Sequence, residues 1–428
     1  MNQAWGREDK VMPGRTKVYF DQLGRRISRR RFGTIVAAGA VAAAVPLRHG
    51  LAASKLKVGL LLPRSGPQGQ IGIDCLRGVE VGLPLLKAKG FPELELMHAD
   101  TETKVDVARV RAASLINDGA QLIIGCFDSG ATMAAAQVCE QHNIPLVVNI
   151  AAVPKLTELG YKWVFRNFPT GPMVVKDAFF NQKELFQISG HTPKTVALLH
   201  VNDTFGTSLA GALFALAPRF KMPYKIVEKI SYDPYGRDFA SEIRKAKASR
   251  AEAVWMVSRL NDAIALTKEM VKQRYEPMGV LSTGPGWYED AYMRATGKYG
   301  DDVISLVPWH DAKKPMSRAL AAEFAKKFPD RNLGPNHSHT FEALLITSDA
   351  FRRAGSTKNT ALQAALKATD IKDNVSTGPG IKFNEKGQNP DTKNSGVQNR
   401  GGKSLVVLPK SAAVSKPIWP MRGWRKRG

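Results

Sequence analysis

The fold is set by the ten residues 58–67, which read VGLLLPRSGP. The continuous apolar run 58–62 suits a strand that is covered on both faces, as in a parallel sheet. It ends at Pro63, and small polar residues then lead into an amphipathic segment. A buried strand, a turn and a helix make one βα unit, so these residues predict the start of an α/β domain.

The same alternation continues along the chain in two series. The further apolar runs predicted as strands lie at 94–99, 122–125, 145–148, 195–200, 224–230, 253–257, 279–282 and 303–307, with short strands near 381–383 and 404–408. Helical stretches between them fall near 206–217, 237–248, 261–273, 288–296, 315–328 and 338–354. A chain of 428 residues is too long for one small domain. We therefore expect two α/β domains with mostly parallel sheets flanked by helices.

Residues 1–53 have the order of an export signal. Ser28-Arg29-Arg30-Arg31-Phe32 is a twin-arginine pattern, and the uncharged segment 33–45 that follows is too short to span a bilayer. Small residues at Ala52 and Ala53 offer a cleavage point. The alternative is an Ala-rich helix of the folded domain, and translation starting at Met12 is a second open point.

The charge balance does not indicate a nucleic-acid-binding protein. The chain carries 62 Lys and Arg against 38 Asp and Glu, but the excess is spread out and is not interleaved with aromatic residues. The one dense cluster, at 422–427, is expected to be a solvated tail. We interpret the basicity as general surface charge that could help association with an anionic membrane.

Motifs of enzymes, cofactors and metals are absent from the sequence. It contains no G-x-G-x-x-G after the first strand, no phosphate-binding loop, no nucleophile elbow and no H-E-x-x-H. His337-Ser338-His339 is interpreted as ordinary polar residues before a helix. Cys75, Cys126 and Cys139 are expected to be buried small apolar residues, with one disulfide to Cys75 as the alternative. No cofactor and no metal ion are predicted.

Small polar residues at the strand-to-helix turns suit an anion instead. Ligands of open α/β sheets lie beyond the carboxyl ends of the strands. At 128–132, helix N–H groups with the hydroxyls of Ser129 and Thr132 could hold a carboxylate without a basic side chain. The alternative for Ser129 is a plain helix N-cap.

A set of short motifs resembles one known family. They are Ser65-Gly66-Pro67 with Gly72, Ser129-Gly130, Leu156-Thr157-x-x-Gly160-Tyr161, Phe165-Arg166, Asn202-Asp203-x-Phe205-Gly206, Gly380-Ile381-x-Phe383-x-x-x-Gly387-Gln388 and Gln398-x-x-x-Gly402-Lys403. From about residue 55 to residue 420 the chain is similar to the periplasmic solute-binding proteins of branched-chain amino-acid ABC transporters, which have the type I periplasmic binding fold. The resemblance implies two Rossmann-like lobes joined by a three-strand hinge.

The same resemblance implies the organisation and role of the protein. After the signal peptide 1–53, lobe 1 comprises 54–172 and 306–380, and lobe 2 comprises 173–305 and 381–428 with the C-terminal tail. The protein is expected to be a periplasmic monomer without catalytic activity. It would capture a small-molecule ligand by hinge closure and deliver it to the permease and ATPase subunits of an ABC importer. A ligand-binding sensor and a twin-arginine-exported enzyme are the alternatives.

The resemblance also carries over ligand positions. Ser129, with Gly130, matches the serine that holds the ligand carboxylate. The other pocket positions that it implies are Ile71, Ile150, Ala151, Ala152, Phe205, Arg259, Gly286 and Trp287. Gly286 stands where an acid would pair with a ligand ammonium, and Glu289 is only nearby.

These departures favour a ligand other than a simple aliphatic amino acid. A buried ammonium needs a paired charge or several acceptors, and Gly286 supplies neither. Arg259 would favour a second anionic group, unless it lies on the outer surface. Ile71, Phe205 and Trp287 could form apolar and stacking walls. We therefore expect the ligand to be an aromatic or other organic carboxylate, and an amino acid remains the alternative.

Overall fold

The computed structural model describes residues 19–20, 26–27 and 55–427. Two short strands precede the main unit, β1 (Tyr19–Phe20) and β2 (Arg26–Ile27), and they pair antiparallel. The twin-arginine pattern, the apolar segment 33–45 and Ala52 and Ala53 of the predicted export signal lie outside the described residues. Within the described residues, no helix combines the length and the apolar character that a membrane span needs.

The first sheet has five parallel strands in the order β4-β3-β5-β6-β7. Its elements are β3 (Leu56–Leu62), α2 (Gly69–Ala88), β4 (Leu94–Asp100), α3 (Val105–Asn117), β5 (Leu122–Gly125), α4 (Ser129–His142), β6 (Leu146–Val148), the 3-10 turn η1 (Pro154–Thr157) and β7 (Val164–Arg166). The apolar run of β3 is almost wholly buried between β4 and β5, as its composition predicts.

The second sheet has seven strands in the order β16-β15-β12-β11-β10-β8-β9. Its elements are α5 (Gly171–Ser189), β8 (Thr195–Val201), α6 (Thr204–Arg219), β9 (Lys225–Tyr232), α7 (Ala240–Ala248), β10 (Ala253–Val257), α8 (Leu260–Lys272), β11 (Val280–Ser282), η2 (Pro285–Trp287), α9 (Asp290–Thr296), η3 (Gly297–Gly300), β12 (Ile304–Pro308), β15 (Asn394–Arg400), β16 (Lys403–Leu408) and η4 (Trp424–Lys426). Only β15 and β16 run antiparallel to their neighbours.

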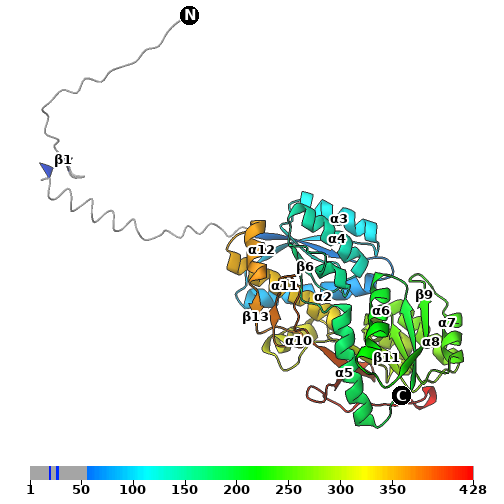
Figure 1. Ribbon diagram of the computed structural model, residues 1–428. Coiled ribbons are helices and arrows are strands. Elements are labelled where there is room, and N and C mark those ends of the chain that lie inside the picture. Colours follow the sequence, from blue (N-terminus) through cyan, green and yellow to red (C-terminus); the bar gives the residue numbers. More distant parts are fainter. Residues whose placement is uncertain (1–18, 21–25, 28–54, 428) are drawn as a thin grey trace, which may run out of the picture. The chain divides into compact units, whose positions relative to one another are not determined.

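The chain passes between the two sheets three times, after β7, after β12 and before β15. After the second passage, α10 (Pro315–Lys327), α11 (Pro335–Ala354) and α12 (Asn359–Lys367) share one apolar core with the first sheet. Figure 1 shows these yellow and orange helices beside the blue α2, from which they are far in sequence. The hairpin of β13 (Asp370–Ile371) and β14 (Ile381–Lys382) joins them. We call the parts around the first and second sheets the first and second lobes.

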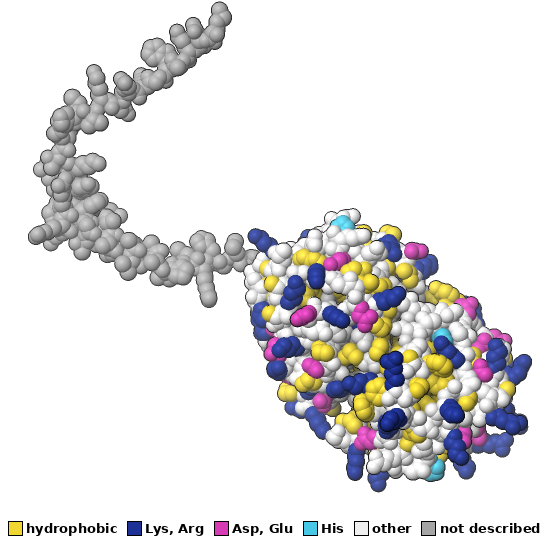
Figure 2. Space-filling model, in the orientation of Figure 1, with side chains coloured by type: hydrophobic (Ala, Val, Ile, Leu, Met, Phe, Trp, Pro, Cys, Tyr) yellow, Lys and Arg dark blue, Asp and Glu magenta, His cyan; other side chains and the backbone are white. Residues whose placement is uncertain are grey.

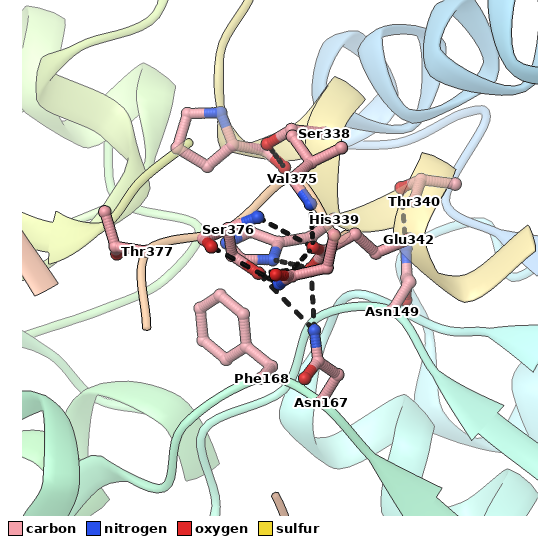
Figure 3. A network of polar contacts seen from close by, with 12 residues as sticks. Asn149, Asn167, Phe168, Ser338, His339, Thr340, Glu342, Val375, Ser376 and Thr377 are labelled. Atoms are coloured by element: carbon pink, nitrogen blue, oxygen red, sulfur yellow. Dashed lines mark hydrogen bonds and ion pairs between the residues drawn. The ribbon is translucent and has the colours of Figure 1, made fainter. Parts of the chain in front are cut away.

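The passages are held together by one buried carboxylate, Glu342 of α11 (Figure 3). Its Oε1 accepts hydrogen bonds from the Val375 and Ser376 amides, each at 2.7 Å. Its Oε2 accepts one from Asn167 Nδ2 at 2.6 Å and one from the Ser376 hydroxyl. Burial alone would raise the pKa of Glu342, but hydrogen bonds from His339 and Ser376 lower it below its usual value. We call the three passages between the sheets the hinge. They are thus arranged around a charged carboxylate whose two oxygens both accept hydrogen bonds.

Each of the three passages contacts this cluster. Asn167 directly follows β7 and also accepts a hydrogen bond from Asn389 Nδ2 at 2.8 Å, on the approach to β15. Ser376 lies opposite His310 in an isolated antiparallel bridge, and His310 follows β12. The cluster therefore fixes the three segments relative to α11.

Two expectations about local structure are wrong. His337 and His339 do not precede the helix but lie buried inside α11. The C-terminal basic cluster is not a solvated tail, because Arg422 donates to both carboxylate oxygens of Asp302 at 2.8 and 2.9 Å and Arg427 is buried. Trp424 also donates to the Tyr275 carbonyl at 2.9 Å. Composition alone suggested a solvated tail because it does not reveal that Arg422 is paired with a carboxylate inside the folded unit.

Other expectations are confirmed. The α/β architecture with mostly parallel sheets is observed, and Cys75, Cys126 and Cys139 are free and buried. Burial raises the pKa of each of these thiols. Figure 2 shows Lys and Arg side chains spread over the visible face of the folded unit, among acidic and uncharged groups.

Candidate ligand-binding site

A pocket lies between the two lobes at the carboxyl ends of their strands. Its volume is about 540 Å³ when the opening to solvent is included. It is lined by Phe127, Ser129, Ile150, Ala151, Ala152, Phe168, Val174, Phe205, Leu209, Arg259, Thr283, Pro285, Tyr288, Val307, Pro308, Pro335 and Asn336. Most of these side chains are apolar, and none is acidic. Six of the ten predicted site residues are among them: Ser129, Ile150, Ala151, Ala152, Phe205 and Arg259.

Ser129 is the first residue of α4, and the N-cap is its neighbour Asp128. Asp128 Oδ1 accepts the Gly130 and Ala131 amides at 2.8 and 3.0 Å, so the helix start is capped without Ser129. The Ser129 hydroxyl makes none of the hydrogen bonds found within residues 55–427. It is thus available to a ligand, and the N-cap interpretation of this residue is wrong.

Thr132 has a different role from the one predicted. Its hydroxyl donates to the Asp128 carbonyl at 2.6 Å and accepts from the Cys126 amide at 3.2 Å. Both of its bonds stay within the turn that follows β5, so it holds the loop in place and is not free to bind a carboxylate.

The second pocket loop, 149–153, is held in place by hydrogen bonds from Arg166. This buried side chain donates to the carbonyls of Ala151 and Val153 at 3.0 and 2.7 Å and to the Thr157 hydroxyl at 2.8 Å. Its Nε donates to Gln388 Oε1 at 2.7 Å. Burial lowers the pKa of Arg166 to about 9, so the guanidinium stays protonated at neutral pH. The motif residues at 157, 166 and 388 therefore form one support for the loop that carries Ile150 and Ala152.

Arg259 lies inside the cleft and not on the outer surface. It precedes α8, and its Nη2 donates to Asp128 Oδ2 of the first lobe at 2.7 Å. Its Nη1 contacts Asp203 Oδ2 of the second lobe, and the guanidinium carbon lies 4.9 Å from the Phe205 ring centre. Burial disfavours the charged form, but the two carboxylates outweigh that effect and raise the pKa of Arg259.

Asp203 repeats in the second lobe what Asp128 does in the first. It is the N-cap of α6, where its Oδ1 accepts the Gly206 amide at 2.8 Å. Each lobe thus contributes a capping carboxylate whose second oxygen bonds Arg259. We call Asp128, Arg259 and Asp203 the latch. Because Arg259 is already paired twice, it does not offer an unpaired charge for a second anionic group.

Four predicted pocket positions lie outside the pocket lining. Ile71 is buried in α2, and Gly130 lines a neighbouring hollow at the cleft mouth. Trp287 is fully buried in the core of the second lobe, with its ring centre 5.4 Å from that of Tyr292. A Cβ on Gly286 would lie 2.1 Å from the Arg259 carbonyl oxygen, so this position has no room for the acid that a ligand ammonium would need.

Several lining residues were missed. Phe127 directly precedes the predicted Asp128-Ser129 turn and has a φ of 71°, an uncommon conformation for a bulky residue, which sequence alone does not signal. Phe168 and Pro308 lie at two of the passages between the sheets, and Asn336 opens α11 far away in sequence. Thr283 and Tyr288 flank the predicted Gly286 and Trp287, so here the sequence pointed to the correct loop but to the wrong side chains.

The residues that the structure describes contain no group of three or more His, Cys, Asp or Glu arranged as metal ligands. What the geometry brings together is an unengaged hydroxyl at a helix start, four aromatic rings and a charge network that joins two lobes across a hinge. Such an arrangement is that of a two-lobed protein with a pocket between its lobes.

The chain belongs to the periplasmic binding protein family, whose model matches residues 55–398. It is 25% identical over 379 residues to Leu/Ile/Val-binding protein homolog 8 of Brucella abortus, which covers 85% of this chain and 93% of the relative. This match and the family model confirm the family expected from the motifs.

Solved structures agree on the fold. The leucine-binding protein LivK of Thermotoga maritima superposes with a TM-score of 0.71 at 19% identity, over 82% of this chain and 97% of that one. A solute-binding protein of an ABC transporter from R. palustris, in complex with benzoate, gives 0.72 at 19% identity, over 86% and 99%. The protein is thus a periplasmic binding protein of the branched-chain amino-acid ABC transporter type, and the family implies a location outside the cytoplasm.

Proposed function

We propose that this protein captures a small aromatic carboxylate by closure of its two lobes and delivers it to the permease of an ABC importer. The observation that carries the proposal is the Ser129 hydroxyl, which lines an aromatic pocket at the start of α4 and has no partner within residues 55–427. Partial positive charge at a helix start favours a carboxylate there.

The pocket walls support an aromatic ligand. Phe127, Phe168, Phe205 and Tyr288 line it, and such rings stack on or pack edge-to-face against a planar ligand. No Asp or Glu lines the pocket, which disfavours an ammonium group. A structural neighbour of similar fold was solved with benzoate, so this architecture accommodates ligands of that class.

A branched-chain amino acid is the second candidate. Relatives at 25% identity are named for leucine, isoleucine and valine, and Ile150, Val174 and Leu209 supply aliphatic wall. An amino acid would place its ammonium among neutral acceptors only. Its affinity should therefore be lower than that of a matching acid without the ammonium group.

The test is isothermal titration calorimetry on refolded residues 55–428 with benzoate, phenylacetate and leucine. We expect an aromatic acid to bind and Ser129→Ala to weaken it at least about tenfold, since a bond to a charged group is lost. The matched control is Ser241→Ala, which removes an exposed hydroxyl from α7. Tighter binding of leucine than of either acid would reject the aromatic ligand, and unchanged binding in Ser129→Ala would reject the site.

We also propose delivery to the periplasm by the twin-arginine route, with residues 1–53 removed. The support is the Ser28-Arg29-Arg30-Arg31-Phe32 pattern before a short apolar segment. The test is a variant in which Arg29, Arg30 and Arg31 are all replaced by Lys, with export followed by cell fractionation and immunoblotting. Export that persists in this variant would contradict the proposal.

A further inference from the structure

The pocket contains two buried polar atoms that have no hydrogen-bond partner among the described residues. They are Oδ1 of Asn336 and Oγ1 of Thr283, and both residues line the pocket. Asn336 is 1% exposed and Thr283 is 4% exposed. Buried polar atoms nearly always have a hydrogen-bond partner, and a buried atom without one destabilises the protein. We therefore expect a ligand in the pocket to supply the missing hydrogen-bond partner of each atom.

The orientation of Asn336 shows which kind of group this partner is. Its Nδ2 donates to Glu289 Oε1 at 2.7 Å, so the amide is held with Oδ1 turned away from Glu289. An amide oxygen can only accept hydrogen bonds. The Thr283 hydroxyl can accept as well, so the pocket wall offers two acceptors, which we call the acceptor pair.

The acceptor pair and Ser129 line the same pocket but come from different elements, since Thr283 follows β11 and Asn336 lies in α11. Ser129 adjoins Asp128, which bonds Arg259 at the end of β10. Thr283 and Glu289 follow β11, the neighbouring strand on the side of the hinge strand β12. A ligand held by Ser129 would thus reach the acceptor pair with its other end.

The acceptor pair suits a neutral donor better than an ammonium. Glu289 is buried behind Asn336 and does not line the pocket, and burial raises its pKa. Gly286 has no space for another acid. An ammonium would therefore be buried without a counter-charge, whereas a hydroxyl or amide N–H needs only an acceptor.

We infer that the pocket selects carboxylates that carry a neutral hydrogen-bond donor, such as a ring hydroxyl, which Asn336 and Thr283 recognise. This inference rests on the proposed function and names the ligand class of the same site. Sites built to bond a hydroxyl reject analogues that lack it, because the acceptors of the site are then left unpaired.

The experiment compares ring-substituted acids of equal size. Calorimetry with 3- and 4-hydroxybenzoate and with 3- and 4-methylbenzoate should show at least one hydroxy acid binding about tenfold or more tighter than its methyl counterpart. Thr283→Val keeps the side-chain volume and removes the acceptor, so it should reduce that ratio several-fold. Asn336→Leu should do the same, and thermal unfolding shows whether it is folded.

The outcomes separate this inference from the proposed function. If methyl and hydroxy acids bind equally and Ser129→Ala weakens both, the aromatic carboxylate site stands and the donor selectivity is rejected. If none of the four acids binds, the proposed function itself fails. A preference for the hydroxy acid that survives in both Thr283→Val and Asn336→Leu would overturn the role of the acceptor pair.

Discussion

Two buried carboxylates, Glu342 at the hinge and Asp262 beside the latch, have pKa values that are shifted in opposite directions. Glu342 accepts hydrogen bonds from two backbone amides, two asparagine side chains and a serine hydroxyl, and its pKa is lowered. Asp262 accepts from the Tyr232 hydroxyl at 2.6 Å and the Arg259 amide at 2.8 Å, and burial raises its pKa to about 6. Burial raises the pKa of both groups, and the larger set of donors around Glu342 outweighs this effect where the smaller set around Asp262 does not.

The comparison extends to how each region is built. The donors to Glu342 are Asn167, which follows β7, and residues 374–376 of the loop between β13 and β14. None of them belongs to the second sheet, so rotation about the hinge need not break these bonds (Figure 3). The latch instead joins Asp128 of one lobe to Arg259 and Asp203 of the other. Separation of the lobes has to break it. We therefore expect the hinge to govern stability and the latch to govern closure.

The largest effect is expected for Glu342→Leu. It leaves several buried donors without an acceptor, so the free energy of unfolding should fall by about 3–5 kcal/mol in urea unfolding. The matched control is Glu323→Leu on α10, whose carboxylate is half exposed and pairs with Lys326; it should change stability by less than about 1 kcal/mol. Equal losses in the two variants would show that the hinge cluster has no special role.

The next effect is expected for Arg259→Met. It leaves Asp128 and Asp203 unneutralised beside the pocket, so affinity for benzoate should fall about 10- to 100-fold in calorimetry. Arg237→Met removes an exposed cation from the same cleft mouth and should change affinity about twofold or less. Addition of Asp128→Asn to Arg259→Met should restore part of the loss, because it removes a repelling charge. No difference between the two arginine variants would refute the latch.

A smaller effect concerns pH and Asp262. An unfolded aspartate titrates near pH 4, below the value of about 6 in the native state. The native state then binds more protons in this window, so this carboxyl makes the free energy of unfolding fall as pH rises from about 4 to about 6. Asp262→Asn should remove about 1–2 kcal/mol of that dependence in urea titrations across the window. Parallel curves for variant and wild type would contradict the raised pKa.

The smallest effect is expected for Asn261→Ala. Its Nδ2 donates to the Pro67 carbonyl at 3.0 Å, an exposed bond between the lobes. Its loss should weaken benzoate binding by about threefold or less, with unchanged stability. A loss as large as that of Arg259→Met would mean that closure depends on the rim of the cleft and not on the latch.

Much of the fold could be predicted because apolar runs mark the strands. The predicted strand at 253–257 coincides with β10, and 122–125 with β5. β15 was missed because its residues are polar, although most are buried. Gln398 Nε2, for example, donates to the Asp302 and Ile418 carbonyls at 3.0 and 2.8 Å. A hydropathy pattern cannot detect a strand whose polar side chains are buried and form hydrogen bonds to backbone groups of other segments.

The site was predictable only in its loops. Ser129, Phe205 and Arg259 line the pocket because each stands at a strand-to-helix turn, which sequence can locate. That Arg259 is paired depends on Asp128 and Asp203, which are 131 and 56 residues away. Asn336 enters the pocket only because α11 packs against the first sheet. Contacts between residues that are this distant in sequence cannot be inferred from a local sequence pattern.

Asp128 serves α4 with one oxygen and the latch with the other, and this sharing has a consequence for ligand charge. In a separated form, Asp128 would lose Arg259 and keep a full negative charge one residue from Ser129. In the closed form, that charge is neutralised by Arg259. Attraction for an anion is then weaker before closure than after it. An anionic ligand would therefore bind the closed form more tightly than the separated form, and its binding would favour closure.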